Sequence, residues 1–356
     1  MQILVATFLG GLRCAPTPGY ALRPLRGRPV SRSHPVPLHP RIVHWTPHCD
    51  GSTPRRRLVK PCLVVWLCGL WVTAAVAQDM PLTQVLIDGE GWEVAADGYG
   101  FTEGPAADRD GNVFFVDVPA SRILKIAATD GKVTTVVEDS GKASGLFFGP
   151  EGKLYACQSE TKKIVSYDAS GHASVIADGI AGNDLVVDRK GNVYVTDMPG
   201  RRVWLVKPGG TPSIVAEGFQ PNGITLTLDE STLVVADWEQ PHLWAFRHET
   251  DGGLRFGAPY YRPVQVPPSQ KQPGSDGMTV DDAGRLYVCT HAGLQVFDPT
   301  GRPCGAIAKP QDKFLSNVIF GGPKFDTLFV TCSDKVYRRT TKTTGTPHHL
   351  WTDSKK

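Results

Sequence analysis

The chain repeats one short pattern, a turn followed by an apolar strand, six times between Phe101 and Cys332. The first copy runs from Asp110 to Asp117, and the third runs from Lys190 to Asp197. One residue marks each turn, and the intervals between the six markers are 41, 39, 39, 54 and 42 residues: Gly111, Gly152, Gly191, Glu230, Gly284 and Asp326. Short strands and turns at such an interval are typical of an architecture that repeats one small sheet.

Each repeat contains enough β-rich runs for four antiparallel strands. In the third repeat, the runs Val203–Val206 and Ser213–Gly218 follow the marker hairpin. Four strands per forty residues, repeated six times, predict an all-β, six-bladed β-propeller. The run from Trp92 to Gly98 resembles a fourth strand but precedes the first blade, so we expect it to complete the last blade and close the ring.

The long interval before the fifth marker contains two proline-rich stretches, 258–263 and 267–273. Proline lacks the N–H group that a strand ladder needs, so we expect both stretches to form a surface loop near the fifth blade. Such a loop on the ligand face of a propeller often shapes access to the site.

The first 77 residues differ in composition from the repeats. Residues 1–54 are rich in Pro and Arg and have no apolar period, which predicts disorder, and we expect translation to start downstream of them. Residues 55–77 combine a basic start, an apolar run and small residues at Ala75 and Ala77, which is typical of a signal peptide. A membrane anchor is the alternative, but the run is shorter than the roughly 20 residues of a spanning helix. The predicted mature domain, 78–356, is then periplasmic or secreted.

The charge of the predicted domain argues against a nucleic-acid partner. Residues 78–356 hold 28 Lys and Arg against 34 Asp and Glu, and no basic run follows Lys60. Nucleic-acid binding needs a concentrated Lys/Arg surface. We expect a monomer or small homo-oligomer without stable membrane association after signal cleavage.

Polar residues recur at one phase of the repeat, where the innermost strand of each blade begins. They stand eight residues before the first five markers and nine before the last: Glu103, Ser144, Asn183, Asn222, Asp276 and Asn317. Inner strands line a propeller's central channel, so this phase predicts a ring of oxygen donors. Two carboxylates with amides and a hydroxyl suit a hard divalent cation, Ca²⁺ first, with Mg²⁺ and Mn²⁺ next. Each residue by itself is also an ordinary turn former.

A second set of polar residues ends the second strand of several blades. Asp117, Asp197 and Asp237 are candidates for orienting a ligand or handling protons, and turn formation explains them equally well. His291 is expected to be structural. Cys157, Cys289 and Cys332 share one phase and are interpreted as packing residues, with a disulfide left open. The sequence has no phosphate loop, zinc motif or Gly-x-Ser-x-Gly elbow.

Five short motifs in this order resemble the gluconolactonase, regucalcin (senescence marker protein) and luciferin-regenerating enzyme family, over about residues 90–340. They are Phe101-Thr102-Glu103-Gly104-Pro105, Gly182-Asn183-Asp184, Pro221-Asn222-Gly223-Ile224, Ser275-Asp276-Gly277-Met278 and Phe320-Gly321-Gly322-Pro323. The resemblance implies a six-bladed fold with Ca²⁺, Zn²⁺ or another divalent cation in the channel. It assigns metal binding to Glu103, Asn222 and Asp276, and places Asn183 near metal and substrate. Sugar-lactone hydrolases of the family often carry Arg two residues before that Asn, where this chain has Ala181.

The resemblance implies a gluconolactonase-like hydrolase that opens a small cyclic ester of sugar or related type. Within it, Glu103, Asn183 and Asn222 are the candidate metal ligands, and Asp276 is the candidate general base as well as a ligand. A cation lowers the pKa of a carboxylate and makes it a poorer base. Asp237 or Asp197 is the alternative base. Asn183, Ser144 and Asp237 are the candidate substrate-binding residues. Two other functions stay open: a binding module with a structural Ca²⁺, and a phosphotriester-type hydrolase on the same site.

Overall fold

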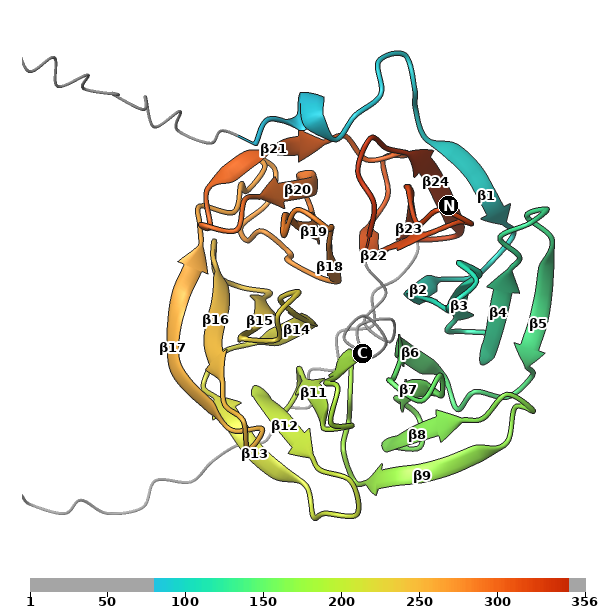
Figure 1. The fold of residues 1–356 in the computed structure, drawn as a ribbon, viewed down its shortest axis with the longest axis vertical. Helices are drawn as coiled ribbons and strands as arrows, with labels where there is room; N and C mark the ends of the chain where they lie inside the picture. Colours follow the sequence, from blue (N-terminus) through green and yellow to red (C-terminus); the bar gives the residue numbers. More distant parts are fainter. Residues whose placement is uncertain (1–79, 346–356) are drawn as a thin grey trace, which may run out of the picture. The chain divides into compact units, whose positions relative to one another are not determined.

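The computed structural model describes residues 80–345, and the predictions for segments 1–54 and 55–77 lie outside this range. The described chain forms six four-stranded antiparallel sheets arranged as a ring, which confirms the predicted six-bladed β-propeller (Figure 1). A short 3-10 helix, η1 (Leu82–Gln84), precedes the first strand. Within these residues, no helix has the length and apolar character needed to cross a membrane.

The strands of each blade follow one another from the centre of the ring outwards. Blade 1 contains β2 (Thr102–Ala107), β3 (Val113–Asp117), β4 (Arg122–Ile126) and β5 (Val133–Val137). Blade 2 contains β6 (Ala143–Phe148), β7 (Leu154–Gln158), β8 (Lys163–Tyr167) and β9 (Ala173–Asp178). Blade 3 contains β10 (Leu185–Val187), β11 (Val193–Asp197), β12 (Arg202–Val206) and β13 (Ser213–Glu217).

The remaining blades follow the same plan. Blade 4 contains β14 (Pro221–Leu226), β15 (Thr232–Asp237), β16 (Leu243–His248) and β17 (Leu254–Tyr261). Blade 5 contains β18 (Met278–Val280), β19 (Leu286–Thr290), β20 (Gly293–Phe297) and β21 (Pro303–Ile307). Blade 6 contains β22 (Leu315–Gly321), β23 (Thr327–Cys332), β24 (Lys335–Thr340) and, outermost, β1 (Glu93–Asp97). The pairing of β1 with β24 confirms the predicted closure of the ring.

The first strand of every blade lies nearest the axis. Neighbouring inner strands contact each other in the order β2, β6, β10, β14, β18, β22 and back to β2, and Figure 1 shows labelled members of this set around the centre. Because the strands alternate in direction, the start of each inner strand and the end of each second strand lie at the same end of the channel. We call this end the mouth.

The apolar core lies between the blades. One cluster joins blades 5 and 6 through residues such as Tyr287, Leu294, Val318 and Val330. Burying the facing sides of adjacent sheets in this way couples neighbouring blades and fixes their inner strands. Cys157, Cys289 and Cys332 are free and fully buried, so their predicted role as packing residues is confirmed.

The turn markers explain why the repeat is visible in the sequence. Gly111 and Gly191 both have a φ of 79°, in the left-handed region where glycine carries no steric cost. Glu230 occupies the equivalent turn in the fourth copy with a φ of 55°. The turn therefore requires a positive φ at this position in these copies, but it does not require that the residue be glycine.

The prediction that residues 258–263 form a loop is wrong for Ala258–Tyr261. These residues belong to β17, and Pro259 lies opposite Trp244. The reason is the position of β17, which is the outermost strand of blade 4 and has one edge without a neighbouring strand, so the missing N–H costs no ladder bond there. The rest of the segment connects blade 4 to β18 of blade 5 outside any strand, which agrees with the predicted loop there.

Candidate functional site

The structure places the predicted ring residues at the starts of the inner strands. Glu103, Ser144, Asn222 and Asn317 lie in β2, β6, β14 and β22, while Asn183 and Asp276 each lie two residues before the first residue of β10 and β18. Main-chain bonds join adjacent blades at this level. Gly145 N donates to Asn183 O at 2.8 Å, and Gly277 N donates to Ser316 O at 2.9 Å.

Glycines allow these strands to approach one another closely. A Cβ atom on Gly277 would overlap the Asn317 side chain, and one on Gly223 would overlap the main chain of Asp276. A Cβ on Gly145 would come within 2.5 Å of Asp184 Oδ1. Each of these glycines belongs to one blade and faces a polar ring residue of the next blade, so the ring depends on the absence of a side chain at these positions.

Three carboxylates at this level act on one another electrostatically. Burial raises the pKa of Glu103 to about 8, and the charge of Asp184 adds to this effect, against a hydrogen bond from Gly104 N at 2.8 Å. Burial also raises the pKa of Asp184 to about 7, although Leu185 N donates to its carboxylate at 2.9 Å. Burial, followed by the charges of Glu103 and Asp184, raises the pKa of Asp276 well above its ordinary value.

Asn222 carries a buried oxygen at the ring that no group among the described residues satisfies. It is 3 % exposed, and its Oδ1 atom has no hydrogen-bond partner. The same side chain hydrogen-bonds to Asp276, which partly offsets the raised pKa of that carboxyl. An unpaired buried amide oxygen is costly unless something binds it. An oxygen-seeking divalent cation between Asn222 and the neighbouring carboxylates would remove both the unpaired oxygen and the carboxylate repulsion.

The donor set mixes carboxylates with amides. Within residues 80–345, no three or more His, Cys, Asp or Glu side chains are grouped so that they could hold a metal ion by themselves. A cation at the ring would therefore need amide oxygens as well as carboxylates, and Asn222 and Asn183 are the predicted amide ligands. Oxygen-only sets of this kind suit Ca²⁺.

Ser144 and Asn183 meet across the boundary between blades 2 and 3. Ser144 Oγ donates to Asn183 O at 2.6 Å and lies 3.2 Å from Ser159 Oγ. Asn183 N donates to Thr196 O at 2.8 Å, so the main chain of Asn183 is held from both sides. Both residues are half-buried. Their substrate-binding roles remain predictions.

The second set of aspartates is engaged in hairpin turns. Asp237 accepts hydrogen bonds from Glu239 N at 3.0 Å and from Trp244 Nε1 at 3.1 Å. Asp197 accepts from Arg202 Nε at 2.9 Å and from Trp204 Nε1 at 3.1 Å. These bonds fix the turns that end β15 and β11. The substrate-binding role of Asp237, and the base role of either residue, remain predictions that compete with this structural use.

Asp184 was not assigned a role by the sequence, although it lies in the Gly182-Asn183-Asp184 motif. Its carboxylate is buried and accepts a hydrogen bond from Asn317 Nδ2 at 3.3 Å. The inner strands carry register shifts, for instance between Glu103 and Ala106 and between Leu315 and Asn317. Such bulges change which residue of a repeat faces the channel, so a count from the turn markers is uncertain by one residue. An acidic residue directly after a ring position is the signal that could have identified Asp184.

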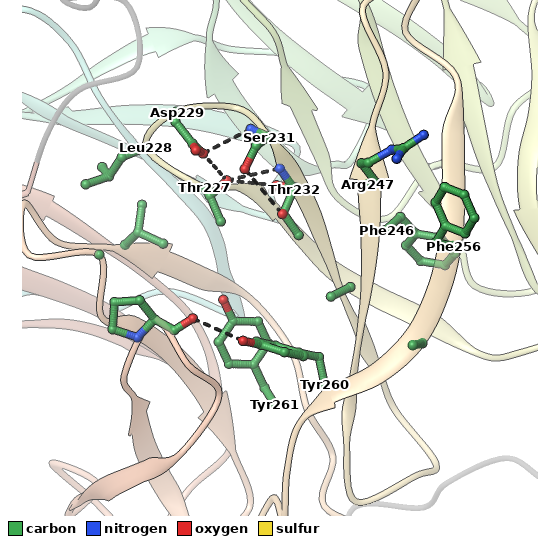
Figure 2. Close-up of a pocket in the computed structure, with 15 residues that line it drawn as sticks. Thr227, Leu228, Asp229, Ser231, Thr232, Phe246, Arg247, Phe256, Tyr260 and Tyr261 are labelled. Atoms are coloured by element: carbon green, nitrogen blue, oxygen red, sulfur yellow. Dashed lines mark hydrogen bonds between the residues drawn. The ribbon is translucent and has the colours of Figure 1, made fainter. Parts of the chain in front are cut away.

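A different cavity, of about 610 Å³, lies between blades 4 and 5 beside the β14–β15 turn (Figure 2). This turn is at the opposite end of β14 from Asn222. Thr227 Oγ1 donates to Asp229 Oδ1 at 2.8 Å, and the Tyr260 hydroxyl donates to Pro299 O at 3.5 Å, so the polar groups there bond mainly to one another. None of the ring residues lines this cavity, and we therefore place the candidate site at the mouth.

The raised pKa values predict how the stability of the cation-free protein depends on pH. Folded Glu103 keeps a proton between pH 4.5 and about pH 8, and folded Asp184 keeps one between pH 3.8 and about pH 7, where the unfolded chain has released both. The native state then binds more protons, so the free energy of unfolding falls as pH rises through these windows. We expect the melting temperature of chelator-treated protein to fall over this range, and the stabilisation by added Ca²⁺ to grow. The double variant Glu103→Gln, Asp184→Asn should have a flatter profile, and an unchanged slope would contradict the assignment.

Comparisons with known proteins agree with the six-bladed fold and identify the family. Residues 101–334 match the family model of the SMP-30/gluconolactonase/LRE-like region. A gluconolactonase from Zymomonas mobilis is 29% identical over 299 residues, covering 71% of this chain and 82% of that protein. The structure of a gluconolactonase from Xanthomonas campestris aligns with a TM-score of 0.64 and 26% identity, covering 73% of this chain and 92% of the other. A calcium-binding regucalcin from Agrobacterium tumefaciens shares the fold, with a TM-score of 0.62 and 15% identity over 72% of this chain and 96% of that one.

Proposed function

Because the chain belongs to the SMP-30/gluconolactonase/LRE-like family, we propose that it is a lactonase that hydrolyses a small lactone at the mouth of the channel. The gluconolactonases from Zymomonas mobilis and Xanthomonas campestris support the reaction class. The observation that supports the location most directly is the electrostatic coupling of Glu103, Asp184 and Asp276, together with the buried, unpaired Oδ1 of Asn222 beside Asp276. Buried titratable groups with shifted pKa values gather at functional sites more often than elsewhere.

Glu103, Asn222 and Asp276, with Asn183 beside them, are the residues that would hold a divalent cation, with Ca²⁺ as the first candidate. A bound cation polarises a carbonyl oxygen and acidifies water, which stabilises developing negative charge by several kcal/mol. The unpaired Oδ1 of Asn222 and the mutual repulsion of the carboxylates support this assignment. The calcium-binding regucalcin of the same fold makes Ca²⁺ a reasonable first ion to test.

We assign the proton transfers to Asp276. A carboxylate oxygen of Asp276 accepts the proton of the attacking water as the water oxygen bonds to the lactone carbonyl carbon. The ring C–O bond then breaks, and Asp276 returns the proton to the departing alkoxide, which gives the hydroxy acid. Burial raises the pKa of the Asp276 carboxyl and a cation bound beside it would lower that pKa, so the balance of these two effects sets its strength as a base. Asn222 hydrogen-bonds to the same carboxyl and would hold it in position.

A lactone panel tests the proposal. We expect purified protein to release acid from γ- and δ-lactones, to lose the activity after chelation, and to regain it when Ca²⁺, Zn²⁺, Mn²⁺ or Mg²⁺ is added back. Acid release measured in a pH-stat gives the rate, and elemental analysis gives the metal content. Activity that survives complete removal of the metal would overturn the cation assignment. A bound metal without hydrolysis of any lactone would favour a binding module, and hydrolysis of phosphotriesters alone would favour the other hydrolase.

A further inference from the structure

Four aromatic rings from four consecutive blades form one cluster at the mouth. Trp238 lies 5.6 Å from His291 and 5.8 Å from Phe314, measured between ring centroids. His291 lies 5.8 Å from Phe314, and Phe314 stacks on Phe101 at 6.3 Å. These separations are those of favourable aromatic pairs. All four residues are half-buried, so part of each ring remains open to solvent. We call Phe101, Trp238, His291 and Phe314 the apolar wall.

The chain fixes the apolar wall directly above the polar ring. Phe101 precedes Glu103 by two residues, and Phe314 precedes Asn317 by three. At the rise of an extended strand, these steps correspond to about 7–10 Å along the channel. Ser316 Oγ donates to Thr102 O at 3.0 Å, which ties the two strand starts together.

Main-chain bonds place the other two rings at the same level. Trp238 N donates to Gln220 O at 2.9 Å, two residues before Asn222. His291 follows Cys289 by two residues, and Cys289 O accepts a hydrogen bond from Asp276 N at 2.9 Å. The apolar wall is therefore bonded through short chain segments to three of the predicted ligands.

A cavity of about 500 Å³ adjoins the apolar wall at His291. It is lined by the loop residues 265–270 together with His291, Ala292, Lys309 and Asp312. The loop is held in place because Gln265 N donates to Gln295 Oε1 at 2.8 Å and Gln295 Nε2 donates to Gln265 O at 3.0 Å. His291 N also donates to Pro273 O at 2.9 Å. The space beside the wall is thus supported by ordered chain.

The two sides of the mouth differ in chemistry. On the side of blades 2 and 3, the ring level carries Ser144, Ser159 and Asn183, which are all polar. On the side of blades 4 to 6 and blade 1, the rings of the apolar wall stand above the ligands. Burial and the charge of Lys309 lower the pKa of His291, which keeps its ring neutral at pH 7 and compatible with an apolar ligand. A ligand that fits both sides has a polar head and an apolar substituent.

We propose that the apolar wall selects lactones whose ring carries an apolar substituent, with the substituent packed on Trp238, His291 and Phe314 and extending into the adjacent cavity. This inference rests on the proposed lactonase function and names its substrate class. Partial burial of an alkyl chain on the wall favours such a substrate over the bare ring. Burying two methylene groups corresponds to about a tenfold gain in kcat/KM.

The test compares three six-membered lactones: δ-valerolactone, δ-decalactone and glucono-δ-lactone. We expect kcat/KM for δ-decalactone to exceed that for δ-valerolactone by about tenfold, and Phe314→Ser and Trp238→Ser to remove most of this preference. Phe314→Leu keeps an apolar surface and should retain most of the preference for δ-decalactone. This variant can also be measured if the Ser variants do not fold. Phe256→Ala is the matched control, because Phe256 is 73% exposed on β17 and remote from the wall.

Two results would overturn the inference: a preference for glucono-δ-lactone over δ-decalactone, or an unchanged preference in both Ser variants. A binding measurement separates this failure from that of the lactonase proposal. Calorimetry with the lactam analogues of δ-valerolactone and δ-decalactone measures binding affinity without any hydrolysis. Tighter binding of the pentyl-bearing lactam that is lost in Phe314→Ser supports the wall even if no lactone is hydrolysed. Equal binding of the two lactams contradicts the wall even if lactones are hydrolysed.

Discussion

Replacing Asp276 by Asn is expected to lower kcat for lactone hydrolysis by about a thousandfold, the usual range for loss of a general base. The amide keeps the size of the carboxyl and retains an oxygen that can face a cation, but it cannot accept a proton. Asp276 is buried, and its pKa is raised well above the ordinary value by burial and by the charges of Glu103 and Asp184. The substitution therefore removes a proton acceptor and leaves the shape of the site.

The measurement must distinguish loss of the general base from loss of a metal ligand, because Asp276 is assigned both roles. Steady-state rates are taken at saturating metal, and the metal content of each variant is determined in parallel. Asp298→Asn is the matched control, because Asp298 is a buried aspartate that accepts hydrogen bonds from Thr300 and Arg302 in a turn after β20. Near wild-type kcat in Asp276→Asn with the metal retained would contradict the base assignment. Asp184, whose pKa lies at about 7, would then be the next candidate.

The fold was predictable because the turns repeat. The backbone at Gly111 and Gly191 adopts a left-handed conformation that favours glycine. A glycine therefore recurs at a constant distance before the strand that follows each of these turns. The closing strand β1 was predictable for a similar reason, because Trp92–Gly98 resembles the other fourth strands. The loop prediction for Ala258–Tyr261 was wrong because the sequence does not show which strand lies at the edge of a blade. Proline, as at Pro259, is tolerated in an edge strand because its missing N–H costs no ladder bond there.

The site was predictable to the level of the ring but not to the level of each side chain. Glu103, Asn222 and Asp276 share a phase, and the structure brings the two carboxyls within electrostatic reach of each other and Asn222 into a hydrogen bond with Asp276. Asp184 was missed because Asn183 N donates to Thr196 O while Thr196 N donates to Asp184 O, so two residues of blade 3 lie opposite one and the phase shifts by a residue. The apolar wall was missed because its rings lie in four different connections that only the closed ring brings together.

Replacing Gly277 by Ala should destabilise the protein by about 3 kcal/mol, near the upper end for overpacking at a tight site. The new Cβ would overlap the Asn317 side chain, which cannot easily move. Val318 N donates to Asn317 Oδ1 at 2.8 Å, and Asn317 Nδ2 donates to Asp184 at 3.3 Å. The main chain of Gly277 is held as well, because its N donates to Ser316 O at 2.9 Å and its O accepts from Cys289 N at 3.0 Å. Relief would require blades 5 and 6 to move apart.

Thermal and urea denaturation with chelator present measure this effect without any assumption about function. A loss of that size lowers the melting temperature by about 5 °C or more in a domain this large. Gly91→Ala is the control, since its Cβ would meet nothing within 4 Å. The second substitution Asn317→Ala removes the overlapped atoms, so the double variant Gly277→Ala, Asn317→Ala should be more stable than the sum of the single losses predicts. Equal unfolding midpoints for Gly277→Ala and Gly91→Ala would show that the inner strands do not meet as closely as the ring of ligands requires, and the candidate site at the mouth would lose its structural basis.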